Sequence, residues 1–275
     1  MTWRTSNEKI RTALLVLCLF VAAKPAEASV SGGGKLDCEA EFVKVMEDRR
    51  YIDLGNKIKR WKALAPQCAG TGIYESRLGT FYTQAKKYDA ARKILNQGVA
   101  HKTGYEKELR LGLFAVQFRQ EKPQELQELA AQAISLVKDF PEWAGGYGAL
   151  AEVRLAQHRF REGIDNLEHA NSLTPSSGAY VLLAMAYYKV DRPRDSAIAM
   201  QKALKLDKEA LKHTQAVCAT AYSLVAIGEL AAADDLLVKH LKVQPAASND
   251  PTYQKTSAFV AKKIQESQSE KKQVF

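Results

Sequence analysis

The chain has 275 residues, of which 46% are hydrophobic and 26% charged, and its formal net charge is +9 at pH 7. This length fits one extended domain. A basic chain without a recognisable nucleic-acid-binding motif does not support nucleic acid as a partner. We expect most of the exposed lysine and arginine to form a solvated surface. The alternative is an anionic partner, such as an acidic protein, a polysaccharide or a membrane surface.

The first 28 residues differ from the rest of the chain. Basic residues precede an apolar run at residues 13–23, and small residues follow at 26–28. We interpret residues 1–28 as a signal peptide that is cleaved before Ser29. The apolar run falls short of the ~20 residues that span a bilayer, which argues against a membrane anchor. Cys18 lies within the run, so we do not interpret it as a lipid-modified cysteine. The sequence therefore predicts an exported protein, periplasmic or secreted, with no transmembrane segment after cleavage.

Export permits disulfides among the cysteines beyond the leader. These are Cys38, Cys68 and Cys218. Cys38 begins the first helical stretch and Cys68 follows the second, so the two lie side by side if these helices form an antiparallel pair. We expect a Cys38–Cys68 disulfide that stabilises the N-terminal repeat by about 3 kcal/mol. We expect Cys218 to be a buried, inert thiol, and a reactive or intermolecular role is the alternative.

Beyond a flexible lead-in at residues 29–37, apolar residues recur at helical spacing in six helix pairs over residues 38–245. The first pair ends at Pro66, the second spans 72–103, the third has a second helix from Pro123 to before Pro141, the fourth spans 144–176, the fifth spans 177–210, and the sixth ends at Pro245. A further helix within residues 246–268 is expected to cap the last pair, before a frayed tail at 269–275. Small residues, such as Gly79 facing Ala91, are expected at the closest helix crossings.

Two of these units have apolar and small residues at offsets typical of one repeat. They are Leu78, Gly79, Tyr82, Ala91 and Leu95 in the second unit, and Tyr147, Leu150, Ala151, Gly163, Leu167, Ala170 and Pro175 in the fourth. This pattern resembles the tetratricopeptide repeat (TPR) family. The second unit departs from the pattern, with Glu75 in place of an aromatic residue and Gly98 in place of an alanine. The resemblance implies an all-α fold, a right-handed α-solenoid of about six TPR-like repeats, but no single function.

In that geometry the first helix of each pair lines a concave groove, whose expected residues form two groups. The N-terminal group is polar and cationic and comprises Arg77, Thr80, Gln84, Arg110 and Gln117; the C-terminal group is mainly apolar and aromatic and comprises Met185, Tyr188, Lys189 and Tyr222. Such a groove suits an amphipathic helix or an extended peptide. The alternative is that the apolar residues pack between neighbouring repeats or under the terminal helix.

Enzymatic functions find little support in the sequence. The five histidines are scattered, no cysteine pair has zinc spacing, and neither a phosphate-binding loop nor a nucleophile elbow is present. We therefore expect no catalysis, cofactor or metal. The first hypothesis is a protein–protein interaction scaffold that takes part in the assembly of an envelope or secretion complex. The alternative is a carrier or chaperone-like binder of an anionic polymer or a lipid headgroup.

Overall fold

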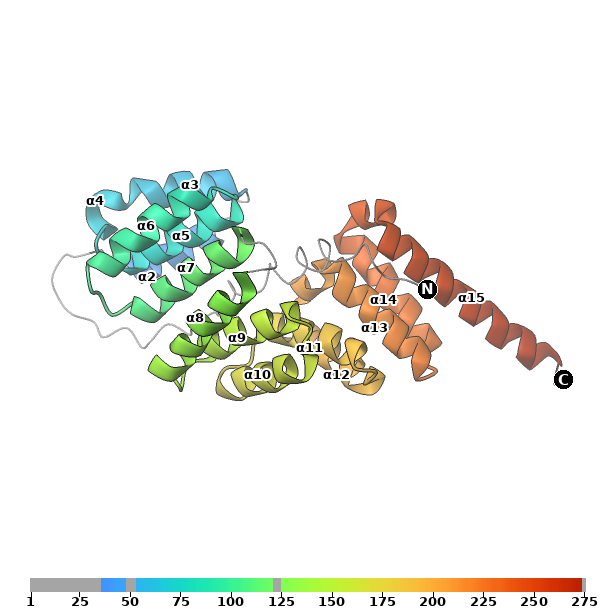
Figure 1. The fold of residues 1–275 in the computed structure, drawn as a ribbon. Coiled ribbons are helices and arrows are strands. Elements are labelled where there is room, and N and C mark those ends of the chain that lie inside the picture. Colours follow the sequence, from blue (N-terminus) through green and yellow to red (C-terminus); the bar gives the residue numbers. More distant parts are fainter. Residues whose placement is uncertain (1–35, 48–52, 121–124, 274–275) are drawn as a thin grey trace. The chain divides into compact units, whose positions relative to one another are not determined.

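A computed structural model describes residues 36–47, 53–120 and 125–273 (Figure 1). In these ranges the chain is helical and contains no strand. The helices are α2 (Cys38–Glu47), α3 (Leu54–Ala63), α4 (Ala65–Cys68), α5 (Ile73–Gln84), α6 (Tyr88–Ala100), α7 (Glu106–Gln120), α8 (Leu126–Asp139), α9 (Ala144–Ala156), α10 (Phe160–Leu173), α11 (Ser177–Lys189), α12 (Pro193–Leu206), α13 (Thr214–Ala226), α14 (Leu230–Val243) and α15 (Pro251–Gln273), with short 3-10 helices η3 (Lys208–Lys212) and η4 (Pro245–Asn249). The expected signal peptide lies outside the described residues, as does Pro123.

The described helices follow one another as successive pairs, as predicted. In the part of the chain that the structure describes, six helix pairs precede α15, and α15 packs against both α13 and α14. The all-α repeat fold is therefore confirmed. The last helix begins at Pro251, inside the region expected for it, and continues to Gln273, beyond the expected end at residue 268; Pro245–Asn249, just before it, forms η4. Packing divides the described chain into an N-terminal unit up to Ala149 and a C-terminal unit from Leu150, so that the division falls within α9.

The core of the N-terminal unit includes Leu95, which lies on α6 and is fully buried. A Cβ atom on Gly79 of α5 would lie 2.5 Å from Leu95, and a Cβ atom on Gly112 of α7 would lie 2.7 Å from it. The atoms closest to an added Cβ on Gly79 thus belong to Leu95, and the facing of Gly79 and Ala91 stays a prediction. Two glycines on neighbouring helices make room for one large side chain, because a buried leucine fills the space that two side chains would need.

The departures from the repeat pattern at Glu75 and Gly98 have a common structural reason. Glu75 is buried, and its carboxylate accepts hydrogen bonds from the backbone N–H groups of Gly70 at 2.6 Å and Gly72 at 2.9 Å. It therefore holds the turn between α4 and α5. A Cβ atom on Gly98 would lie 2.8 Å from the Cβ atom of Glu75 and 2.6 Å from Leu109. Glycine at position 98 thus leaves space for the carboxylate side chain.

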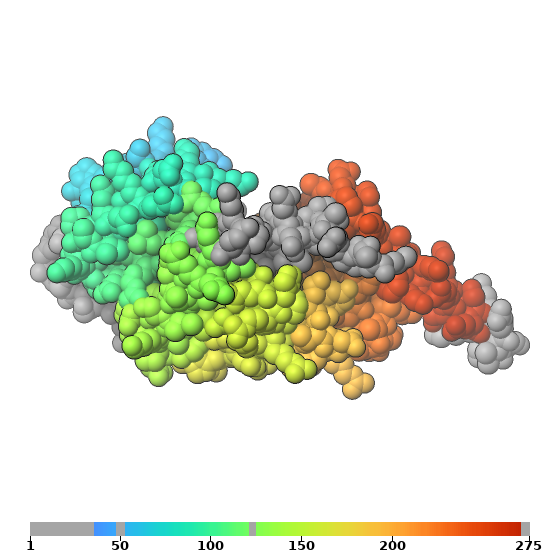
Figure 2. Space-filling view, in the orientation of Figure 1, coloured from blue at the N-terminus to red at the C-terminus, as the bar shows by residue number. Residues whose placement is uncertain are grey.

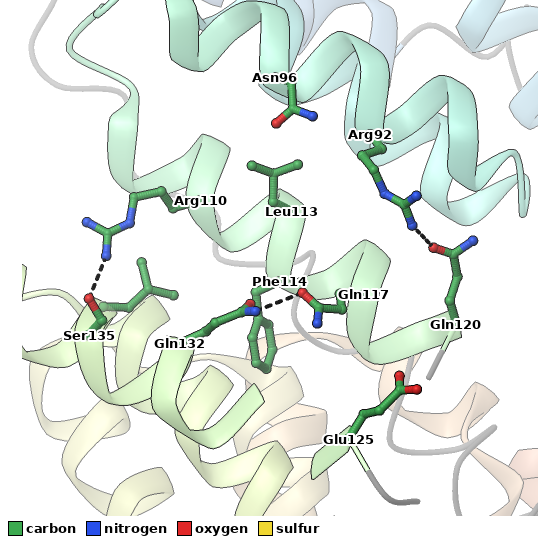
Figure 3. A pocket seen from close by; sticks show the side chains of 11 residues that line it. Arg92, Asn96, Arg110, Leu113, Phe114, Gln117, Gln120, Glu125, Gln132 and Ser135 are labelled. Carbon is green, nitrogen blue, oxygen red and sulfur yellow. Dashed lines mark hydrogen bonds between the residues drawn. The ribbon is translucent and has the colours of Figure 1, made fainter. Parts of the chain in front are cut away.

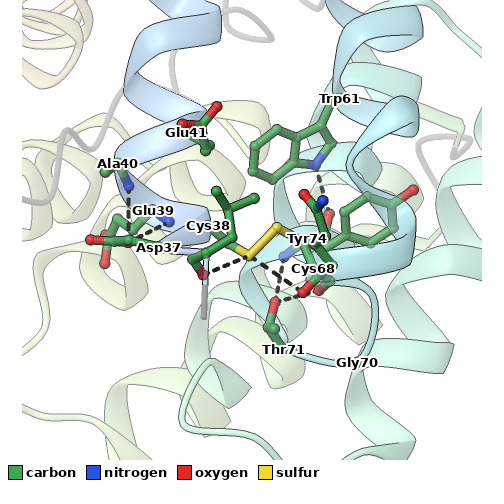
Figure 4. The surroundings of a disulfide bond; sticks show 12 residues. Asp37, Cys38, Glu39, Ala40, Glu41, Trp61, Cys68, Gly70, Thr71 and Tyr74 are labelled. Atoms are coloured by element: carbon green, nitrogen blue, oxygen red, sulfur yellow. Dashed lines mark hydrogen bonds between the residues drawn. A yellow bond between two sulfur atoms is a disulfide. The ribbon is translucent and has the colours of Figure 1, made fainter. Parts of the chain in front are cut away.

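The predicted Cys38–Cys68 disulfide is present in the N-terminal unit, with 5.8 Å between the two Cα atoms (Figure 4). Both cysteines are buried beside Trp61, whose indole N–H donates to the backbone oxygen of Tyr74 at 3.1 Å. The Trp61 and Tyr74 rings stack with their centroids 5.8 Å apart. The bridge therefore joins the start of α2 to the end of α4 over an aromatic core.

The helices of the C-terminal unit share one core. They lie against one another in chain order up to α15, as the colours from yellow to red follow in Figure 2. Tyr253, Thr256 and Val260 of α15 are buried in this core. His240 of α14 is also fully buried, with its Nδ1 atom 2.5 Å from the backbone oxygen of Leu211 in η3. No described helix is both long enough and apolar enough to cross a lipid bilayer.

Candidate partner-binding site

Three aromatic rings in the C-terminal unit form a continuous row across successive helices. Tyr188 of α11 stacks on Tyr222 of α13 with ring centroids 6.0 Å apart, and Tyr222 contacts Phe259 of α15 at 5.0 Å. All three side chains are partly exposed. We call Tyr188, Tyr222 and Phe259 the aromatic row. It presents apolar surface at the boundary between core and solvent.

The repeat explains why these rings meet. Tyr188 and Tyr222 are one repeat of about 34 residues apart, so they occupy equivalent positions on two successive first helices. The preceding residue, Tyr187, turns inward instead: it is buried, and its hydroxyl donates to the carboxylate of Glu168. Since adjacent helical residues lie on different faces, one tyrosine joins the core while the next remains accessible. Burial, followed by the neighbouring Tyr222, raises the pKa of Tyr188, so its hydroxyl stays uncharged at neutral pH.

Other predicted residues border the aromatic row. Met185 is partly buried and packs against the same core. Lys189 is exposed, and its Nζ atom lies 5.7 Å from the centre of the Tyr188 ring. A cation over an aromatic face is attracted by the negative potential of the ring. The structure thus brings together the four predicted C-terminal residues, on α11 and α13.

The N-terminal group is not one cluster in the structure. Arg77 of α5 lies over the ring of Phe42, with 4.6 Å between its Cζ atom and the ring centroid. Burial lowers the pKa of Arg77, while the carboxylates of Glu39 and Glu108 act in the opposite direction. Tyr105 donates a hydrogen bond to Glu39 at 3.3 Å. Arg77 thus lies over an aromatic ring, and the carboxylates that act on its pKa belong to the same unit.

Arg110 and Gln117 instead face α8, the second helix of their own pair. Arg110 donates to Asp139 at 2.8 Å and to Ser135 at 3.0 Å, and Gln117 accepts a hydrogen bond from Gln132 at 2.8 Å. These contacts place the two residues in a hollow that neither Thr80 nor Gln84 lines. Thr80 is half-buried, and Gln84 is exposed at the end of α5.

Three residues that the sequence did not single out for binding also belong to these surfaces. Phe259 extends the aromatic row, and Arg92 and Gln132 line the hollow. The sequence predicts a cap over the last pair from the apolar spacing of this helix, and that spacing does not mark Phe259 as a binding residue. Sequence pattern gave no signal for Arg92 or Gln132, because polar residues on a second helix are typical of a solvated surface. The described residues contain no group of three metal-ligating side chains.

No protein-family model matches the sequence, and neither does any curated protein. Solved structures are similar in fold. TTC0263, a thermophilic TPR protein from Thermus thermophilus, aligns with a TM-score of 0.52 and 18% identity over 69% of this chain and 98% of that chain. Yeast Tom70 aligns with a TM-score of 0.55 and 16% identity over 83% of this chain and 50% of that chain. The protein thus has the fold of a TPR solenoid.

Proposed function

We propose that this protein is a non-catalytic scaffold that binds a helix or an extended segment of a protein partner on the aromatic row. The observation that carries the proposal is the row itself: the rings of Tyr188, Tyr222 and Phe259 contact one another across three helices and remain partly exposed. Rings that only filled the core would be buried. Partly exposed tyrosines supply large contact area and are enriched among the residues that dominate binding energy.

The terminal helix extends this surface. Phe259 of α15 is the third member of the row, and the residues that anchor α15 in the core are Tyr253, Thr256 and Val260. Tyr222 therefore packs against α15 through Phe259, but α15 does not bury it, because both rings remain partly exposed. Lys189 lies at the edge of the row, with its Nζ atom 5.7 Å from the centre of the Tyr188 ring.

The proposed location is an exported compartment, periplasmic or secreted. The disulfide supports it, because structural disulfides persist in oxidising compartments and are rare in reducing ones. In that setting we propose that the scaffold contributes to the assembly of an envelope or secretion complex.

Binding of an anionic polymer or a lipid headgroup is supported less well. The two arginines expected to attract anions already have acidic neighbours: Glu39 and Glu108 act on Arg77, and Asp139 binds Arg110. A guanidinium that is paired within the protein contributes less to an external anion, since the existing pair would have to be exchanged. The salt dependence of binding separates the two hypotheses, because ions screen exposed charges much more than apolar contacts.

The test is affinity capture from the native compartment with three proteins: the unchanged chain, a Met185→Ala/Tyr188→Ala/Tyr222→Ala variant, and a control with Ile198→Ala and Val238→Ala. The control removes exposed apolar side chains from α12 and α14. We expect the row variant to lose its partners by at least tenfold, the control to retain them, and the retained binding to persist at high salt. Recovery of the same partners by all three proteins would show that the row is not the binding surface.

A further inference from the structure

A hollow of about 700 Å³ lies in the N-terminal unit between α6, α7 and α8 (Figure 3). Its volume is within the range of natural ligand sites, roughly 300–1,000 Å³. It differs from the aromatic row because its walls come from the second helices α6 and α8, with α7 between them. Its polar lining includes Arg92, Asn96, Gln117, Gln120 and Gln132.

Pairs of bonded side chains fix both ends of the hollow. In Figure 3, Arg92 donates to the amide oxygen of Gln120 on one side, and Arg110 donates to Ser135 on the other. Gln117 and Gln132 lie between these pairs and are joined by their own hydrogen bond of 2.8 Å. The lining is therefore held in place by contacts between helices, which reduces the entropy lost on binding.

The charges around the hollow do not favour an anion. Arg110 is bonded to Asp139 at 2.8 Å and lies 3.4 Å from a carboxylate oxygen of Glu106. The carboxylate of Glu125 also lines the hollow. Arg92 and Arg110 are thus accompanied by three acidic groups, so the hollow does not concentrate positive charge. An uncharged polar ligand fits this lining better than a phosphate or an acidic polymer.

The Gln117–Gln132 pair supplies a specific recognition group. Gln132 donates one N–H to the oxygen of Gln117, which leaves the amide nitrogen of Gln117 and the amide oxygen of Gln132 without a partner among the described residues. Reversing both amides would leave one nitrogen and one oxygen in the same way. A donor beside an acceptor is complementary to one residue of an extended segment, whose own N–H and C=O point to the same side of the strand.

We propose that this hollow binds an uncharged, extended peptide segment, with the backbone C=O and N–H of one ligand residue hydrogen-bonded to the amides of Gln117 and Gln132. The stretch of α7 from Arg110 to Gln120 is about 15 Å long at 1.5 Å per residue, which accommodates about four or five extended residues. A neutral sugar is the less favoured ligand, because the one aromatic side chain of the lining, Phe114, is only 1% exposed and offers no face for a sugar ring. The site is independent of the aromatic row.

The test uses the full chain labelled with ¹⁵N, in which the side-chain amide signals of Gln117 and Gln132 are followed by NMR. The probes are N-acetylated, C-amidated pentapeptides of Ser, Thr, Asn, Gln and Ala, the same peptides with methylated backbone nitrogens, maltotetraose, and inorganic phosphate. We expect only the unmethylated peptides to shift both signals. Gln117→Met/Gln132→Met should weaken peptide binding about tenfold, because two hydrogen bonds are lost.

Gln97→Met/Gln127→Met is the matched control, since both glutamines are exposed on α6 and α8 and lie outside the hollow. It should bind the peptides within about twofold of the unchanged chain, as should the Met185→Ala/Tyr188→Ala/Tyr222→Ala variant. A response to phosphate or maltotetraose alone, equal binding of the methylated peptides, or no response to any peptide at millimolar concentration would overturn the proposal. None of these results would affect the aromatic row.

Discussion

The N-terminal and C-terminal units are both built from helix pairs of the same kind. The side chains on the first helices of these pairs differ between the two units. In the N-terminal unit, Arg77 and Arg110 point to acidic or aromatic groups of their own unit. In the C-terminal unit, Tyr188 and Tyr222 stack on each other and stay partly exposed. A charged residue in a repeat is therefore not by itself a binding group, since neighbouring helices can already balance its charge.

The two units also close their ends by different means. The first repeat is closed covalently by Cys38 and Cys68. The last is closed by packing and hydrogen bonds: His240 contacts the backbone oxygen of Leu211, and the Tyr253 hydroxyl donates to the backbone oxygen of Leu237 at 3.3 Å. A terminal repeat has a neighbour on one side only, so each end needs an additional constraint.

Removal of the disulfide should have the largest effect and should be confined to the N-terminal unit. Cys38→Ala/Cys68→Ala opens a loop of sequence separation 30, and we expect the free energy of unfolding of this unit to fall by about 3 kcal/mol. Amide hydrogen exchange measured by mass spectrometry should accelerate about 100-fold in α3 and α5 and remain unchanged in α13 and α14. Cys218→Ala is the control. Equal acceleration in both units would contradict the separation drawn between them.

Removal of the buried histidine should have a smaller effect, at the other end. His240→Ala leaves a cavity in α14 and deprives the Leu211 carbonyl of its partner, so we expect a loss of about 2 kcal/mol. Hydrogen exchange should accelerate in α14, η3 and α15, while α3 and α5 keep their protection. His169→Ala, an exposed change on α10, should leave exchange unaltered. Unchanged protection of α15 in the His240 variant would show that the histidine does not hold this end.

The smallest effect is expected for Cys218, which should not react in the native state. The thiol is 2% exposed, and burial raises its pKa to about 11. Because a raised pKa favours the neutral thiol, only about one thousandth is thiolate at pH 8, and the thiolate fraction rises about tenfold per pH unit up to pH 11.

Ellman's reagent, applied to a chain that begins at Ser29, measures this directly. The native protein should release no colour at pH 8, and the denatured, unreduced protein should show one thiol. Three thiols would mean that the disulfide is absent, and rapid reaction of the native protein would mean that Cys218 is accessible.

The candidate site was predictable where it depends on the repeat. Tyr188 and Tyr222 lie one repeat apart, so their juxtaposition follows from stacking alone. Phe259 required the structure, since α15 is not a complete repeat and its register on α13 is set by packing. In the sequence, Glu75 is only a departure from the repeat pattern. In the structure, its carboxylate accepts hydrogen bonds from two backbone N–H groups. Helical periodicity also does not predict which side chains Arg77 and Arg110 contact.

The helix pairs, their order and the disulfide follow from the sequence alone, because helical spacing and the position of a cysteine at a helix end are local properties. Which polar side chains meet depends instead on the tertiary packing. Arg110 and Ser135 are separated by 25 residues, and Gln117 and Gln132 by 15. Their contacts depend on the rotation and depth of α8 against α7, which the packing of buried side chains sets. The aromatic row therefore follows from the repeat, whereas the polar hollow follows from packing.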